Sequence, residues 1–194
     1  LRAGYVNVVN GLVFTSYPNS PFYRVCRTQL SAVVNYAHYK REHRPLILSE
    51  YTGMRSVQLQ FYPDDMTDVS PLAQAHTVVL LGCSGVIDVS ALRNVHTVYL
   101  SMCNRVKNMS ALSTVHTLSI SQCAPMIHSI SALGTVHTLS LSHCWSWMDA
   151  SALGNVHTLS LSDCNELTDV SALGTVHTLN VVRCSHLMDV SALS

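Results

Sequence analysis

Histidine and cysteine recur along this chain at a fixed spacing, and both residue types can bind metals or take part in catalysis. The phrase "VHTLSLSDC", Val156 to Cys164, contains one of each, and close copies of it fill most of the sequence. The histidines advance in steps of 20, 20, 21, 20 and 20 residues, at His76, His96, His116, His137, His157 and His177. The cysteines follow with the same steps, at Cys83, Cys103, Cys123, Cys144, Cys164 and Cys184. Stacked imidazoles could bind a metal ion or respond to pH, and stacked thiols could form disulfides.

The regularity of the spacing argues against these reactive roles. A metal site needs ligands that converge, whereas one histidine per copy supplies parallel donors, and no two cysteines have C-x-x-C spacing. Parallel Cβ vectors do not suit the dihedral angle of a disulfide. Serine, histidine and aspartate recur along the array, so no copy indicates one nucleophile held against one base. We therefore expect no enzyme, no cofactor and no metal, and a structural role for both columns.

Two further expectations concern these columns. Each thiol should point into the turn that follows the strand and bond weakly to the backbone of the neighbouring copy. Each imidazole should pack on its neighbours at the start of a strand. Protonation of the histidine row should then lower the stability of the fold below about pH 6, because like charges repel.

The repeat itself predicts the elements that position these side chains. Self-similarity at about 20 residues is typical of a solenoid. The alternation of apolar residues around Leu159 and Leu161 predicts a short strand with those side chains turned inwards. In the phrase "DVSAL" that follows, Ser171 can cap a short helical or 3₁₀ turn. The first copy reads "DVSPL", which places Ser70 at the N-cap and Pro71 at N1.

One strand and one turn per copy resemble a leucine-rich repeat, because "VHTLSLSDC" matches L-x-x-L-x-L-x-x-N/C position by position. The phrase "CNELTD" resembles the cysteine-containing repeats known from F-box proteins, and "DVSAL" resembles the convex segments of internalin-like repeats. The resemblance implies a solenoid with parallel strands on a concave face and short helical or 3₁₀ turns on the convex side. The wording "DVSALGNVHTLSLS" is similar to repeat arrays of protists and of the large DNA viruses that infect them.

Two regions follow from this pattern. A degenerate copy from Met54 to Gln74 lacks histidine and cysteine but keeps the apolar positions, so the array of about seven coils should occupy residues 54–194. Residues 1–53 should form a partly helical N-terminal cap, with a helix from Pro21 to about Arg41 and Cys26 and Val33 to Val34 buried. The phrase "FYRVCRTQLSAVV" resembles the last helix of an F-box. The array stops at "DVSALS" without a polar cap, so we expect further repeats or another chain to cover that end.

Composition narrows the class of partner. The chain has 11 basic and 11 acidic residues, and this neutral balance argues against non-specific binding of nucleic acid. No apolar run approaches the roughly 18 residues that span a bilayer. Seven cysteines are an odd number, which favours reduced thiols. We expect an intracellular, cytoplasmic protein or one associated with a virion, with a protein as its partner.

Specificity should lie in the outward-facing columns that vary. The threonine after each histidine never changes, so it forms a uniform floor. The large or charged side chains that vary are the predicted partner-binding residues: Tyr99, Met102, His143, Trp145, Asp163 and Arg183. The sequence thus predicts a non-catalytic scaffold for protein–protein interaction. The alternatives are a structural subunit of a large assembly such as a viral capsid, an F-box-like substrate adaptor, or an enzyme.

Overall fold

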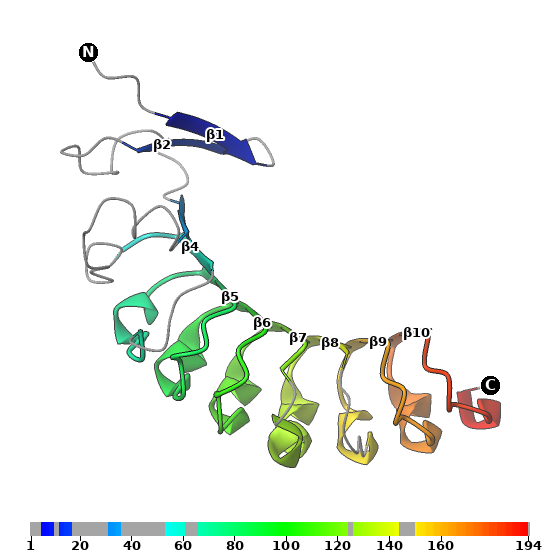
Figure 1. The fold of residues 1–194 in the computed structure, drawn as a ribbon. Helices are drawn as coiled ribbons and strands as arrows, with labels where there is room; N and C mark the ends of the chain where they lie inside the picture. Colours follow the sequence, from blue (N-terminus) through cyan, green and yellow to red (C-terminus); the bar gives the residue numbers. More distant parts are fainter. Residues whose placement is uncertain are drawn as a thin grey trace.

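The computed structural model describes residues 5–9, 12–16, 31–35, 53–60, 66–123, 126–143 and 150–193. Within these ranges the chain forms a curved array of coils (Figure 1). Parallel strands line the inner, concave side of the curve, and 3₁₀ turns lie on its outer side. The fold class predicted from the repeat is therefore confirmed.

The strands form two sheets. Strands β1 (Tyr5–Val9) and β2 (Leu12–Ser16) pair as an antiparallel hairpin. The main sheet has eight strands in the order β10-β9-β8-β7-β6-β5-β4-β3, and every neighbouring pair in it is parallel. These strands are β3 (Ser31–Asn35), β4 (Ser56–Gln60), β5 (Thr77–Leu81), β6 (Thr97–Ser101), β7 (Thr117–Ser121), β8 (Thr138–Ser142), β9 (Thr158–Ser162) and β10 (Thr178–Val182).

One 3₁₀ turn follows each strand from β4 onwards. The turns are η3 (Ser70–Leu72), η4 (Ser90–Asn94), η5 (Ser110–Thr114), η6 (Met126–Thr135), η7 (Ser151–Leu153), η8 (Ser171–Thr175) and η9 (Ser191–Leu193). The longest, η6, lies in the copy with the 21-residue step, while β7 and β8 still pair Thr117 with Thr138. In the part of the chain that the structure describes, no helix is long and apolar enough to cross a bilayer.

The N-terminal region departs from the sequence prediction. Residues Ser31–Asn35 form β3, which pairs in parallel with β4, so the predicted helix from Pro21 to Arg41 is wrong over these five residues. Adjacent β-branched Val33 and Val34 suit a strand, and the edge of β4 offers backbone groups that need partners. The sheet therefore begins before Met54. The rest of the expected helix, including Cys26, lies outside the described residues.

The core is a continuous apolar stack between the sheet and the turns. From β4 to β9 the second and fourth residues of every strand are buried, as the alternation predicts. In the coil that contains β9, for example, Leu159, Leu161 and Leu173 are each at most 1% exposed. In β10 the same positions are only half-buried, because β10 is the outermost strand of the sheet.

An acidic or amide side chain caps most of the turns. Asp88 accepts a hydrogen bond from the backbone N–H of Ser90 through Oδ1 (2.8 Å) and another from the Ser90 hydroxyl through Oδ2 (3.0 Å). The equivalent pairs are Asp68 and Ser70, Asn108 and Ser110, Asp169 and Ser171, and Asp189 and Ser191. Serine is thus the donor and the first residue of the turn, after an N-cap valine or methionine. The prediction that Ser70 and Ser171 act as N-caps is wrong.

The cap can be tested at Asp88. The hydrogen bonds from the Ser90 backbone and hydroxyl lower the pKa of Asp88, so its charged form is favoured in the folded chain. Substitution Asp88→Ala should lower the melting temperature by about 2–4 °C at pH 7. Substitution Asp88→Asn should preserve most of the stability, because Asn108 performs the same role one coil later. Equal losses for both variants in thermal melts would contradict the capping role.

Candidate functional site

Small hydroxyl side chains cover most of the concave face. Residues that alternate with the buried ones in β7, β8 and β9 are threonine at the first position and serine at the third and fifth. Strands β4 to β10 contain no Asp, Glu, Lys or Arg. A partner on this face would therefore meet a polar but uncharged floor on which little charge must be desolvated.

One coil presents two large exposed apolar side chains. Tyr99 in β6 is 41% exposed and alternates with buried Val98 and Leu100, so it projects from the concave face. Met102, just after the same strand, is 37% exposed. The structure thus brings two of the predicted partner-binding residues onto one coil. Trp145, a third candidate, lies outside the described residues, as does Cys144.

The column before each cysteine has an unusual backbone. Gly82 has φ of 64°, and the five residues that follow it in this column have φ between 52° and 54°: Met102, Gln122, His143, Asp163 and Arg183. This left-handed conformation is costly for any residue with a Cβ. Its benefit is a hydrogen bond between coils, such as that from the Asp163 N–H to the Val182 carbonyl (2.9 Å). Four of the six predicted partner-binding residues thus occupy one constrained column. In the sequence, the glycine at position 82 was the sign that this column has positive φ.

At the C-terminal end of the column, Asp163 contacts both Arg183 and His143. Arg183 donates two hydrogen bonds of 2.8 Å to the carboxylate of Asp163, one from Nε and one from Nη2. Nε2 of His143 lies 3.8 Å from Asp163 Oδ2. The hydrogen bond from Arg183 lowers the pKa of Asp163, with smaller help from His143. Asp163 is therefore engaged within the chain, while 72% of the Arg183 side chain is exposed.

The cysteine column lies beneath this one. Cys83, Cys103, Cys123 and Cys164 are buried, and each thiol donates a long hydrogen bond to a strand carbonyl of the preceding coil, at 3.5 to 3.8 Å. Cys184 makes the same contact at 3.9 Å and is half-buried. Burial raises the pKa of Cys123 to about 11, so its thiol stays protonated and a poor nucleophile at neutral pH. The geometry is that of packing and tethering.

Every position of the repeat thus occupies one place in the coil. The apolar consensus residues point into the core, the cysteine tethers the turn, and each strand pairs in register with the next copy. One parallel strand and one 3₁₀ turn are formed in each copy of about 20 residues. The chain has the leucine-rich-repeat fold.

Solved structures include leucine-rich-repeat proteins that resemble the chain at low identity. Internalin C2 from Listeria monocytogenes is 21% identical, with a TM-score of 0.47, and the match covers 76% of this chain and 69% of that one. Internalin InlF from the same organism is 16% identical, with a TM-score of 0.43 and coverage of 75% and 52%. The functional domain of InlJ, also from Listeria monocytogenes, is 14% identical, with a TM-score of 0.36 and coverage of 76% and 44%. No protein-family model and no curated protein matches the sequence.

The histidines form a stacked row along one edge of the leucine-rich-repeat sheet. Successive rings from His76 to His157 have centroids 4.5 Å apart and interplanar angles of 13° to 17°. The last ring, His177, is tilted by 38° at the same distance. In the first five, Nδ1 lies 3.1 to 3.2 Å from the hydroxyl of the following threonine. The invariant threonine therefore orients an imidazole, a role that sequence reasoning missed.

This row should make stability depend on pH. Desolvation, followed by repulsion from His137 and His177, lowers the pKa of His157 in the folded chain. Below about pH 6.5 the unfolded chain therefore binds more protons than the folded chain. The contribution of the neutral His157 to the stability of the fold is complete above that pH and is lost as the pH falls below it. The melting temperature should therefore decrease as the pH is lowered from about 7.5 to about 5.5.

Three carboxylates in the described ranges do not affect this test. The pKa values of Asp88, Asp163 and Asp189 are lowered, so these groups stay charged throughout the window. Thermal melts of a variant with His137→Gln and His157→Gln should show a flatter pH dependence than the parent chain. Equal melting temperatures for the parent at both pH values would contradict the prediction that the histidine row makes stability depend on pH.

Proposed function

We propose that this leucine-rich-repeat chain is a non-catalytic scaffold that binds another protein through its concave face, with Tyr99 and Met102 as anchors. The observation that carries the proposal is the exposure of these two side chains on one coil. The other large exposed apolar residues among those described, Val182, Met188 and Val190, all lie in the last coil. Tyr99 and Met102 are therefore the large apolar side chains that the body of the array exposes.

The surroundings suit an interface of this kind. Large aromatic side chains are enriched among the residues that dominate binding energy, and they work best when water is excluded around them. The serine and threonine side chains next to β6 are small, so a partner can approach the sheet closely and cover Tyr99. Because the floor is uncharged, binding through it should depend little on salt concentration.

The test compares two matched double variants. Tyr99→Ala with Met102→Ala removes the anchors, and Ser119→Ala with Gln122→Ala changes the same two positions one coil later. Affinity purification with quantitative mass spectrometry should show a loss of partner recovery of at least about tenfold for the first variant alone. Both variants should melt within a few degrees of the parent. Unchanged recovery with the folded anchor variant would overturn the proposal.

A further inference from the structure

The histidine row continues into an arginine in the first coil. Strand β4 pairs with β5 so that Ser56 lies beside Thr77, which places Arg55 at the position of His76 in the first coil. The backbone N–H of His76 donates to the Arg55 carbonyl (2.8 Å), as expected for neighbours in one column. We define the histidine edge as this column: Arg55, His76, His96, His116, His137, His157 and His177.

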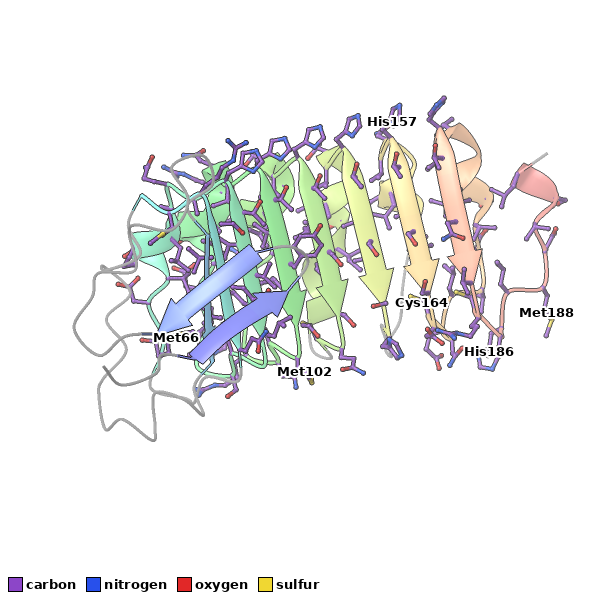
Figure 2. The ribbon with its side chains drawn as sticks, turned by 90° about the horizontal axis from the view of Figure 1, so that it is seen from above. Met66, Met102, His157, Cys164, His186 and Met188 are labelled. Atoms are coloured by element: carbon purple, nitrogen blue, oxygen red, sulfur yellow. The ribbon has the colours of Figure 1, made fainter. Side chains whose placement is uncertain are left out.

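The rings of the histidine edge face solvent. The threonine hydroxyl occupies Nδ1 of each ring from His76 to His157, so Nε2 is the nitrogen that remains for a ligand. A hydroxyl both donates and accepts, so it can hold the ring when Nδ1 is bare and when Nδ1 is protonated. Figure 2 shows the rings projecting outwards along one edge of the sheet, with His157 on that edge and His186 on the opposite one.

The carboxylates in the described ranges lie away from the histidine edge, in segments that also contain Arg105, Lys107 and Arg183. The carboxylates in the described ranges follow the strand ends or precede the turns, on the cysteine side: Asp68, Asp88, Asp163, Glu166, Asp169 and Asp189. The segments that lead from each 3₁₀ turn into the histidine edge contain one charged residue, Arg93, and the strands contain none. No carboxylate in the described ranges faces the rings, so protonation would leave a row of uncompensated positive charge.

We propose that the histidine edge binds a linear chain of phosphate groups below about pH 6. The column repeats at the strand spacing of about 4.8 Å, so seven positions extend over about 29 Å. Each protonated ring offers one Nε2–H donor per coil, and charge-assisted hydrogen bonds to phosphate oxygens are strong. Phosphate oxygens that lie along the row also relieve the repulsion between neighbouring rings, so that binding and protonation favour each other.

Geometry disfavours a metal ion at this edge. Stacked rings have nearly parallel Nε2 lone pairs, whereas metal ligands must converge on one point. The described ranges also contain no group of three or more His, Cys, Asp and Glu side chains placed to hold a metal. A line of anions suits the row, because each ring can donate to a different oxygen along the chain.

The primary test measures binding of fluorescently labelled inorganic polyphosphate at low, constant salt. Affinity should be at least about tenfold higher at pH 5.5 than at pH 7.5, and it should fall as salt rises. At pH 5.5 polyphosphate should also raise the melting temperature, which it should leave unchanged at pH 7.5. Equal affinity at the two pH values would overturn the proposal.

Variants locate the site. A triple variant, His96→Gln, His116→Gln and His137→Gln, should lose at least about tenfold in affinity at pH 5.5. The single variant His116→Gln should lose part of it, while His186→Gln, which removes one histidine from the opposite edge, should bind like the parent. Retained binding in a triple variant that is folded at pH 7.5 would overturn the assignment. This edge is separate from the concave floor, so either proposal can fail without the other.

A second ligand distinguishes the source of the phosphates. A single-stranded oligonucleotide with the same number of phosphates should bind no more tightly than polyphosphate, because the faces of the inner imidazole rings are covered by their neighbours in the stack and do not offer a platform for bases. Binding of the oligonucleotide without binding of polyphosphate would contradict recognition of the phosphate chain itself.

Discussion

Substitution Leu139→Ala is expected to lower the free energy of unfolding by about 2–5 kcal/mol. Leu139 lies in β8 near the middle of the array and is fully buried. Removing its side chain loses apolar burial and leaves a cavity that the two neighbouring coils can fill only by shifting together. Because each coil contacts only the next, the loss should also weaken the coupling between the two halves of the solenoid.

Urea unfolding followed by circular dichroism measures this effect. The matched control is Ser140→Ala, which changes the next residue of the same strand on the concave face and should alter stability by less than about 0.5 kcal/mol. A broader transition in Leu139→Ala than in the control would report that the halves unfold separately. A loss below about 1 kcal/mol would mean that β8 is not packed as described.

Substitution Gly134→Ala should also destabilise the fold, by about 1–3 kcal/mol, through overpacking. Gly134 is buried at the end of η6, and a Cβ built there meets the backbone carbonyl oxygen of Ala152 in the next coil. A backbone atom cannot rotate away as the end of a side chain can, so the coils must separate. Thermal and urea unfolding would measure the loss.

Position 113 supplies the control for Gly134. Ser113 occupies the same place in the preceding turn and already has a Cβ, so Ser113→Ala should be close to neutral. Gly154→Ala should behave like Gly134→Ala, because its Cβ would meet the carbonyl oxygen of Ala172. If Gly134→Ala were as stable as the parent, the close contact between these two coils would not exist in solution.

The sequence was sufficient to predict the array because each of its two periods corresponds to an element of the structure. The period of two around Leu159 and Leu161 matches a strand, and the period of 20 matches one coil, so the apolar register follows without tertiary information. The strand β3 was missed because five residues that include Val33 and Val34 are too short to distinguish from a buried helical segment. Pairing with β4 makes these residues a strand, and the sequence alone does not reveal that pairing.

The finer features of the site depend on contacts between coils. The role of the threonine column requires the ring of the preceding histidine, and the left-handed column requires the carbonyl of the next strand. Local patterns did contain two signs of this chemistry. Gly82 stands where the backbone has positive φ, and Asn108 replaces aspartate where a side-chain oxygen caps the turn. Each was visible as a residue type, but its reason lies in the fold.

The copy with the extra residue shows where this molecule tolerates a change in length. Between His116 and His137 the step is 21 residues, yet the two rings remain 4.5 Å apart and β7 and β8 remain in register. The longest turn, η6, lies in this copy on the convex side. A peptide tag inserted into a convex turn should therefore leave both the concave floor and the histidine edge in place, whereas one extra residue in a strand would turn its side chains to the wrong face. The convex side is where this solenoid can be lengthened, labelled or tethered to a surface for measurement.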